Sequence, residues 1–451
     1  MSARRFLSAF GLACFAALAI VLTKWGLALS PVKAGLISSP AETPPVEKRV
    51  ALRYMIWGRE NEVRQEREKL EEFVADNPDI QVELVQAGGT GYQIKLATML
   101  AGGVPPDVFM VHEAMFPTLA ENELIMPLDD LVAQDPDVDL DDFFPRVVEE
   151  CRYKGTLYRL PASFNTVVTY YNRDMFDEAG VSYPTDDWTW EDMLAKARAL
   201  TRRDEDGRTT RYGVMGIGPW LTYAMMMWQN GGEMFDEEDR LVIGKPGYLN
   251  ANVEALQFCA DLQLEEHVHP TEAALDTLPA NPFVAGMAAM NLGGTWVNNQ
   301  IRGRNDFRWD IAPPPRRKER ATLVFGGSPV ICGATGHPEE SWRLLKAMVS
   351  EKWQRRIARE GRSLPARKSV AQDLQTPGIP PEVHLGVIFQ VVPYGRSQPI
   401  GPNVSEWMEQ PIADLRDRVL LGSVSGEEIT EELLKMQSRF DGSCPYCSTL
   451  R

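Results

Sequence analysis

Residues 153–180 read YKGTLYRLPASFNTVVTYYNRDMFDEAG, and this stretch decides how we divide the chain. It opens with a short polar segment typical of a hairpin, continues through a segment that contains Pro161, and ends in a predicted helix. Residues 160–165 have the character of a strand that crosses between two lobes. We therefore expect this crossing to form the floor of a cleft.

The chain before this stretch alternates between predicted strands and helices. Residues 50–57 are apolar and β-branched enough for a buried strand, and a helix follows that Asn77-Pro78 ends. A second strand at 80–86, a helix at 92–101 and a third strand at 107–112 complete the series. This β-α-β-α-β order predicts a mostly parallel sheet with helices on both faces. In such sheets ligands bind beyond the carboxyl ends of the strands.

The chain beyond residue 180 continues the alternation. A helix at 190–201 is expected to begin after Thr189. Further elements are expected as a strand at 212–217, a Met-rich helix at 220–230, a helix at 252–264, a strand at 288–292 and a helix at 338–360. Residues 310–315 and 361–366 are the expected second and third crossings. The acidic stretch 135–150 is interpreted as one solvated helix.

Length and charge limit the kinds of protein that this chain can be. A chain of 451 residues is too long for one hydrophobic core, so two or three domains are expected. Lys and Arg total 47 against 63 Asp and Glu, which gives a net charge of -16. This balance disfavours nucleic acid or an anionic membrane surface as a partner, because binding to phosphate depends on cationic side chains. An acidic surface also favours a soluble monomer.

The N-terminus has the pattern of a secretory signal. Arg4 and Arg5 precede an apolar run over residues 6–22, and Lys24 follows it. The run is long for a signal peptide and slightly short for a spanning helix of roughly 20 residues, so a cleaved signal and a retained anchor both stay open. Either one places the body of the protein outside the cytoplasm. Residues 31–49 are rich in Pro and small residues, as in a flexible tether.

The cysteines give one informative spacing, at Cys444 and Cys447 near the C-terminus. A C-x-x-C in an exported protein is compatible with a local disulfide, a redox pair or half of a metal site. Because no second C-x-x-C or His pair stands near it, we favour a terminal loop that is closed by a disulfide or simply reduced. Cys14 does not fit a lipoprotein site well, since Gly11 occupies a position where a bulky apolar residue is usual.

A succession of short motifs runs through the chain in a fixed order. No single motif is decisive, but the probability that all of them occur in this order by chance is small. They are Gly103-x-Pro105-Pro106-Asp107, the segments 153–161 and 170–176, Trp188-Thr189-Trp190-Glu191-Asp192, Gly231-Gly232, the segment 283–290, Gly293-Gly294-Thr295-Trp296, and Leu364-Pro365-Ala366-Arg367.

This succession resembles the extracellular solute-binding proteins of ABC importers, in particular the sugar-binding group that includes the maltose-binding protein. The resemblance covers about 380 residues, from Val50 to roughly Gln437. It implies two doubly wound α/β lobes that are joined by a hinge of crossing strands and close over a ligand. The implied division is 1–30 signal or anchor, 31–49 tether, 50–165 and 312–362 first lobe, 166–311 and 363–440 second lobe, and 441–451 tail.

The candidate ligand residues stand at strand ends and in predicted loops. A sugar needs aromatic platforms for its C–H faces, and carboxylates, amides or backbone N–H groups for its hydroxyls. By the resemblance, Trp296 matches a stacking residue, Trp407 matches an aromatic that closes on the sugar, and Asn165 replaces an acidic residue of the maltose binder. The expected ligand-binding residues are Trp57, Glu60, His112, Glu113, Phe164, Asn165, Trp220, Trp296, Gly327 and Trp407.

Several of these candidates also have an ordinary structural interpretation. Trp57 and Trp407 are compatible with core or helix packing, Glu60 with a helix start, and Gly327 with a plain turn. A metal role for His112 is disfavoured because a lone His is usually a hydrogen-bonded polar residue. The stripe Met225, Met226 and Met227 is more often core than a cofactor site.

The resemblance implies a sugar ligand, permease subunits of an ABC importer as partners, no cofactor, no metal and no catalysis. An exported hydrolase with paired carboxylates is the alternative from another class, but the abundance of Asp and Glu makes such a pair uninformative. The sequence holds no G-x-S-x-G, H-E-x-x-H or P-loop motif. A membrane-anchored sugar sensor, which would use the same ligand closure, also stays open because of the long N-terminal run.

Overall fold

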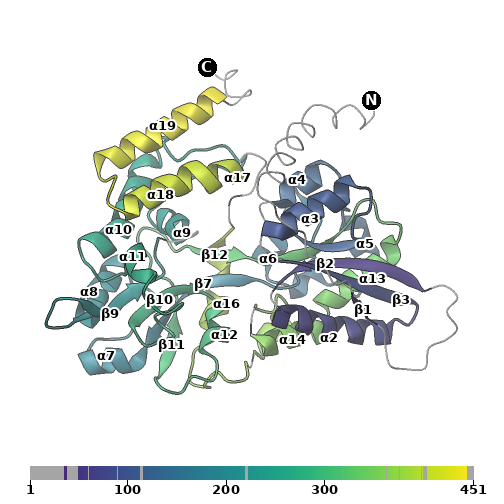
Figure 1. Cartoon of the computed structure of the whole chain (residues 1–451), viewed down its shortest axis with the longest axis horizontal. Coiled ribbons are helices and arrows are strands. Elements are labelled where there is room, and N and C mark those ends of the chain that lie inside the picture. Colours follow the sequence, from purple (N-terminus) through teal and green to yellow (C-terminus); the bar gives the residue numbers. More distant parts are fainter. Residues whose placement is uncertain are drawn as a thin grey trace, which may run out of the picture.

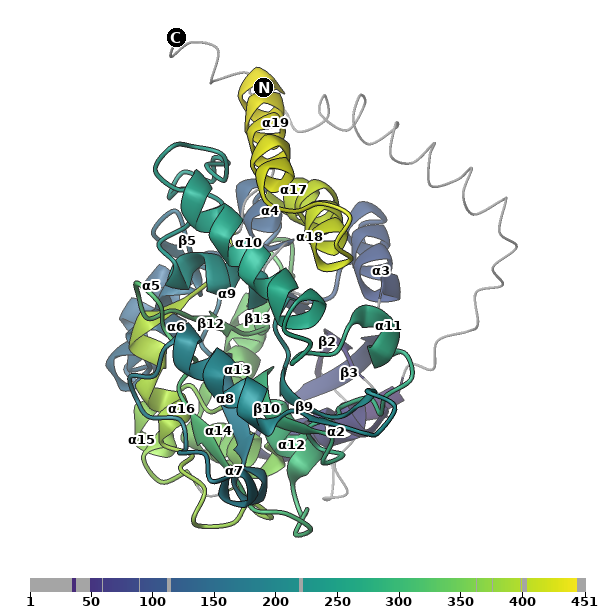
Figure 2. The same ribbon diagram turned by 90° about the vertical axis from the view of Figure 1, so that its left-hand side faces the viewer.

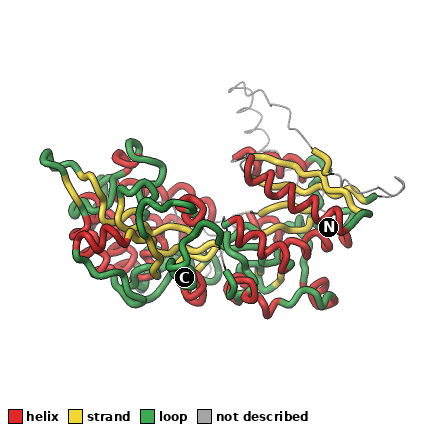
Figure 3. The backbone as a smooth tube through the Cα atoms, turned by 90° about the horizontal axis from the view of Figure 1, so that it is seen from below, coloured by secondary structure: helices red, strands yellow, loops and turns green. Residues whose placement is uncertain are grey.

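The computed structural model describes the backbone of residues 35–37 and the residues 49–58, 60–88, 90–111, 115–218, 222–361, 363–374, 376–397, 399 and 404–443. Two lobes lie side by side, each built around its own β-sheet (Figure 1). Seen from below, they are separate bodies that only a few segments join (Figure 3). We call the lobe with the five-stranded sheet the first lobe and the lobe with the seven-stranded sheet the second lobe.

The first lobe contains the predicted β-α-β-α-β series. Strands β2 (Val50–Trp57), β3 (Ile80–Ala87) and β4 (Val108–Val111) are parallel, and α2 (Glu60–Asp76) and α3 (Thr90–Ala101) connect them. The sheet order is β1-β3-β2-β4-β13, and the edge strands β1 (Gly35–Ile37) and β13 (Ser328–Ile331) run antiparallel to their neighbours. The sequence interpretation of this region is confirmed.

Both faces of the first sheet are covered by helices. The core on one face joins α2 to α13 (Pro338–Val349) through Leu70, Phe73 and Leu344, while Tyr92 and Phe116 belong to the core on the other face. Helices α13 and α14 (Glu351–Glu360) come from late in the chain, yet they lie beside α2 (Figure 1). Burial of the aliphatic stripes on both faces is the main stabilising term for such a layered lobe.

The second lobe has a mixed sheet around β7 (Asn165–Asn172). Strand β7 pairs with β10 (Ala288–Gly294), β11 (Trp309–Ala312) and β12 (Thr322–Phe325), all antiparallel, and β10 pairs in parallel with β9 (Thr209–Met215). The remaining strands are β8 (Arg202–Arg203) and β14 (Gly395–Arg396), and β5 (Arg152–Tyr153) and β6 (Thr156–Leu157) form a separate hairpin.

Helices pack around the second sheet and extend beyond it (Figure 2). The expected start at Thr189 is confirmed, because Thr189 and Asp192 form a reciprocal capping box on α8. The Met-rich stripe is buried on α9, as core packing predicts. The helices here are α7 (Arg173–Ala179), α8 (Trp190–Leu200), α9 (Thr222–Gln229), α10 (Leu249–Leu264), α11 (Glu272–Leu275), α12 (Val297–Ile301), α16 (Val387–Gln390), α17 (Val404–Trp407), α18 (Ala413–Leu420) and α19 (Glu427–Ser443).

The stretch 135–150 does not form the single solvated helix that we expected. It holds only the 3-10 turn η3 (Leu140–Asp142) and the short α6 (Pro145–Glu149). The same hydrophobic core that contains Leu70 and Phe73 also buries Val138, Phe143 and Val147. The chain therefore follows the surface of this core and does not continue along one helix axis. The other short elements are the helices α4 (Phe116–Glu121), α5 (Asp129–Gln134) and α15 (Lys368–Ala371), the 3-10 helix η4 (Val392–Tyr394) and the π-helix η5 (Met408–Ile412).

The second crossing lies elsewhere than at the expected residues 310–315. Those residues begin within β11, which pairs with β7 inside the second sheet. Strand β12 also pairs with β7, and only then does the chain pass through Gly326 and Gly327 into β13 of the first sheet. The position of the second crossing therefore depends on backbone hydrogen bonds between strands that are far apart in the chain. We therefore propose the lobe boundary after residue 325 rather than after residue 311.

The first and third segments run side by side. Phe164 and Leu364 exchange two backbone hydrogen bonds, with N···O distances of 3.2 and 2.9 Å. Beyond residue 366 the chain stays on the first lobe, where Arg367 Nη1 donates to Asp142 at 2.9 Å. It reaches the second lobe by His384, whose backbone N–H donates to Asp310 at 2.8 Å. The crossing that we expected at residues 361–366 is therefore not complete there, and we propose that the third segment of the hinge extends from residue 363 to residue 384.

Candidate functional site

The two sheets meet where β12 leads into β13. Phe325, the last residue of β12, stands opposite Asn165, the first residue of β7. Gly326 and Gly327 follow, and like Phe325 both are partly exposed, whereas Val324 and Ser328 on either side of these three residues are buried. A Cβ atom on Gly326 would lie 2.4 Å from the carbonyl oxygen of Ser163, so only glycine lets the first and second crossings approach this closely.

Asn165 is held in place by Thr295. The Thr295 hydroxyl donates to Asn165 Oδ1 at 2.9 Å, and the Thr295 backbone N–H donates to the carbonyl of Thr166 at 3.0 Å. Thr295 is buried while Asn165 is partly exposed. Because its oxygen accepts from Thr295, the Asn165 amide keeps its NH₂ group as a donor, and no partner for this group is seen among the described residues.

Trp296 lies next to this amide on the second lobe. It is the N-cap residue of α12, and its partly buried ring meets Phe325 edge to face, with centroids 5.9 Å apart. A Cβ atom on Gly294 would lie 1.9 Å from the Trp296 ring, so Gly294 provides the space that the indole occupies. The register Phe325–Asn165 therefore brings an aromatic surface and an amide together at the junction.

Trp57 approaches the junction from the first lobe. Its ring meets Tyr92 edge to face at 5.2 Å, and the Tyr92 hydroxyl donates to the carbonyl of Met110 at 2.6 Å. Burial raises the pKa of this hydroxyl, so it remains a donor. A Cβ atom on Gly327 would lie 2.7 Å from Trp57 Cζ2, which places the ring directly against the second crossing.

The three hinge segments line one cavity of about 100 Å³ on the first-lobe side of the junction. Ser163, Gly327 and Ser363 come from the first, second and third segments, and Lys69 and Trp353 from the helices of the first lobe. The cavity shows that the three segments converge at one place.

Phe164 has a different role from the one we expected. It is 0% exposed and lies in the same hydrophobic core as Leu70 and Phe73 of α2. Its ring meets the ring of Phe144 at 5.7 Å and that of Phe389 at 6.5 Å. A residue with no exposed surface packs the hinge and does not present its ring to a ligand. The neighbouring Asn165 is the residue of this pair that reaches the surface.

The remaining candidates are not joined to this group by the contacts seen. Glu60 is exposed at the start of α2. Trp407 is partly buried and meets Phe440 of α19 edge to face at 5.6 Å, within the helical part of the second lobe. His112, Glu113 and Trp220 lie outside the described residues.

The structure adds residues that we did not select from the sequence. Thr295, Phe325 and Tyr92 support Asn165, Trp296 and Trp57 through the contacts above. Thr295 stands in the Gly-rich motif Gly293-Gly294-Thr295-Trp296, but nothing local assigns it a partner 130 residues away. Among the described residues, no group of three or more His, Cys, Asp or Glu side chains is placed to hold a metal ion.

Two α/β lobes joined by crossing segments, with aromatic rings and an amide at the junction, define the class of two-lobed binding proteins. The bacterial extracellular solute-binding protein family has a family model that matches residues 69–384, and the chain belongs to this family. The members of this family are binding proteins, and the family description calls them extracellular, which means outside the cytoplasm. In the part of the chain that the structure describes, no helix has the length and apolar character needed to span a membrane.

Solved structures and curated relatives agree with this family. An ABC substrate-binding protein of Listeria monocytogenes, solved with cycloalternan, has a TM-score of 0.76 at 25% identity and covers 88% of this chain and 99% of its own. The sugar-binding protein MalE of Xanthomonas citri has a TM-score of 0.74 at 23% identity, with 89% and 100% covered, which shows a shared fold. An arabinooligosaccharide-binding protein of Halalkalibacterium halodurans is 26% identical over 37% of this chain and 35% of its own.

Proposed function

We propose that this protein binds a sugar, as a mono- or oligosaccharide, in the cleft between its lobes and delivers it to an ABC-type importer. The observation that carries the proposal is the pairing of Trp296 and Asn165 on either side of Phe325 at the junction. An indole ring suits the C–H face of a sugar, and an amide NH₂ suits a hydroxyl. Cycloalternan in the Listeria protein and α-D-tagatose in a solute-binding protein of Thermotoga lettingae support this ligand class.

Trp57 and Gly327 are the proposed contribution of the first lobe. They stand against each other at the second crossing, so a ligand that touches both Trp57 and Trp296 would hold the two lobes together. Closure of two lobes over a ligand is a common hinge motion and buries the ligand from water. We further propose that the closed form is the one that the permease subunits receive outside the cytoplasm.

The first experiment is a thermal-shift screen of the purified protein against a sugar library, because a ligand that binds only the native state raises the melting temperature. The screen includes cycloalternan, arabino-oligosaccharides, maltose and tagatose. Calorimetry then measures the affinity of the best ligand for Trp296→Ala, which we expect to be weaker by roughly tenfold or more, as for a buried aromatic anchor.

The control variant is Asn299→Ala, which lies on the same helix as Trp296 but is exposed. It should bind like the wild type. Equal affinity of Trp296→Ala and Asn299→Ala would remove Trp296 from the site. Cleavage of a glycoside by the purified protein would contradict a function limited to binding, and an uptake defect in cells that lack the protein would test delivery.

A further inference from the structure

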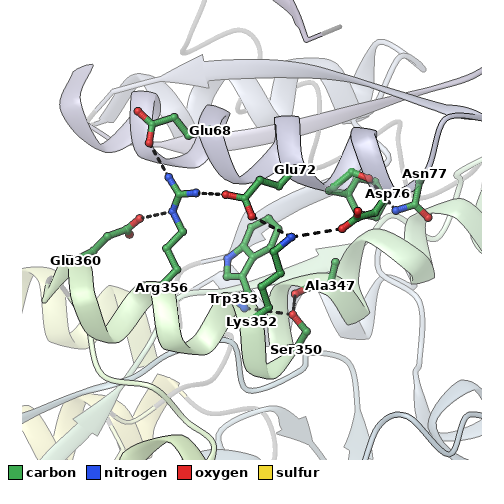
Figure 4. A network of polar contacts seen from close by, with 11 residues as sticks. Glu68, Glu72, Asp76, Asn77, Ala347, Ser350, Lys352, Trp353, Arg356 and Glu360 are labelled. Carbon is green, nitrogen blue, oxygen red and sulfur yellow. Dashed lines mark hydrogen bonds and ion pairs between the residues drawn. The ribbon is translucent and has the colours of Figure 1, made fainter. Parts of the chain in front are cut away.

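Helix α14 is fastened to the first lobe by ion pairs along its outer side (Figure 4). Arg356 contacts Glu68 and Glu72 of α2, each at 2.6 Å. Lys352 contacts Glu72 at 3.0 Å and Asp76 at 3.4 Å. These contacts, with the Trp353 ring that packs under Lys69, make α14 move as one body with the first lobe.

The inner side of α14 holds two of the hinge segments. Gln354 is 0% exposed, and its Nε2 donates to the carbonyl of Ala162 in the first segment. Its Oε1 accepts from the backbone N–H of Ala366 in the third segment at 2.6 Å. Since both ends of a buried amide are used, α14 and these segments keep a fixed geometry.

Arg302 reaches the C-terminal end of α14 from the second lobe. Its Nη2 donates to the carbonyls of Arg359 at 3.0 Å and Glu360 at 2.8 Å. A guanidinium placed at the negative end of a helix dipole forms charge-assisted hydrogen bonds with otherwise unpaired carbonyls. A Cβ atom would lie 2.0 Å from Nη2 if added at Gly361 and 2.7 Å from Cγ if added at Gly378, so the two glycines leave the space that Arg302 fills.

The short helix α12 joins this contact to the candidate site. Trp296 is its N-cap residue and Arg302 its C-cap residue. Val297 and Ile301 are buried, and the Tyr170 hydroxyl of β7 donates to Asn298 Oδ1 at 3.0 Å. With so few residues between its caps, α12 cannot move at Trp296 without moving Arg302.

We propose that Arg302 is a positioning residue that ties the second lobe to α14 and couples the orientation of Trp296 to the angle between the lobes. The tie is separate from the three hinge segments and is one of the contacts that we expect to change when the lobes rotate. Its effect on ligand affinity rests on the proposed function, whereas its effect on the interlobe angle does not.

The test compares Arg302→Met with Arg355→Met, which removes an equal charge from α14 itself. The partners of Arg355 are Glu351 on the same helix at 2.8 Å and Asp373 at 4.0 Å, and neither lies on α12. Small-angle X-ray scattering of the ligand-free proteins should show a changed radius of gyration and a broader distance distribution for Arg302→Met alone. Its affinity for the ligand found in the screen should change by roughly tenfold, the size expected for loss of a charge-assisted hydrogen bond. Arg302→Lys, which keeps the charge and has its N–H donors on a single nitrogen, should restore part of both effects.

Scattering profiles and affinities of Arg302→Met that equal those of Arg355→Met would overturn the proposal. A lower melting temperature without a changed profile would also overturn it, because that result assigns Arg302 only to local stability. If no sugar binds the wild type, the scattering comparison still decides the matter, so failure of the proposed function is distinguishable from failure of the tie.

Discussion

The first lobe joins α14 to α2 through charged side chains at the surface, whereas the second lobe holds the irregular stretch 231–248 with buried amide side chains. In the first lobe, Arg356 meets Glu68, Glu72 and Glu360, and the carboxylates of Glu68 and Glu72 are 51% and 46% exposed. Exposed ion pairs of this kind each contribute little, because water and salt screen them.

In the second lobe, buried amides bind the backbone of the irregular stretch 231–248. Asn252 Nδ2 donates to the carbonyls of Glu233 at 2.8 Å and Ile243 at 2.9 Å. Gln437 Nε2 donates to Leu241 at 2.7 Å, and Gln437 Oε1 accepts from Gly244 at 3.1 Å. Both side chains are at most 5% exposed.

The difference follows from the regularity of the backbone in each lobe. In the first lobe, helices and paired strands satisfy most backbone groups, so side chains are free to meet at the surface. The stretch 231–248 has no long element, and its carbonyls need side-chain donors once they are buried. Amide loss should therefore cost more in the second lobe than ion-pair loss in the first.

The largest effect is expected for Asn252→Leu. Two backbone carbonyls, that of Ile243 buried and that of Glu233 partly buried, lose their donor, so the free energy of unfolding should fall by roughly 3 kcal/mol. Urea denaturation measures the change, and Asn250→Leu is the control because Asn250 lies on the same helix and is exposed. If both variants unfold at the same urea concentration, buried amides do not stabilise this lobe more than its surface does.

A second test uses acid, because the second lobe buries His269. Its Nδ1 contacts the carbonyl of Pro270 at 2.7 Å and its Nε2 accepts from Ile217 N–H at 3.2 Å, so the ring is neutral. Burial lowers the pKa of His269 from 6.5 to about 4. As the pH falls below 6.5 the unfolded chain takes up the proton first, and stability is lost down to about pH 4.

The expected loss from His269 is roughly 3 kcal/mol across that pH range. Urea denaturation at pH 7.5 and pH 4.5 measures it, and His269→Gln should remove this share of the pH dependence. The control is His267→Asn, since His267 is exposed and has a positive φ of 52° that Asn tolerates. An unchanged pH dependence in His269→Gln would contradict a neutral buried imidazole.

The smallest effect is expected for Arg356→Met in the first lobe. Although Arg356 contacts three carboxylates, its loss should lower the free energy of unfolding by only about 1 kcal/mol at low salt and by less at high salt. Denaturation in both salt conditions checks this. A loss as large as that of Asn252→Leu would mean that the network of Figure 4 stabilises the first lobe as strongly as buried amides stabilise the second.

Local signals in the sequence predicted several elements at their observed positions. The strand Val50–Trp57 and the helix Glu60–Asp76 follow from apolar periodicity and from Asn77-Pro78, and the start of α8 follows from Thr189 and Asp192. The prediction failed at 135–150, where an amphipathic pattern that looked helical instead follows the curved surface of the core. Asn165 and Trp296 were predicted as ligand residues from the family resemblance. Their contact through Phe325 follows instead from the register of β12 against β7.

The sequence by itself determined that the chain forms alternating strands and helices, because periodicity and capping act between near neighbours. The expectation that residues 153–180 connect two lobes depended in addition on the family resemblance. Only the tertiary structure decided that the second crossing is Gly326-Gly327, that Phe164 is buried, and that Arg302 meets the end of α14. Each of these depends on partners far away in the chain. Pairing between such partners is set by packing and backbone hydrogen bonding in three dimensions, which no short segment encodes.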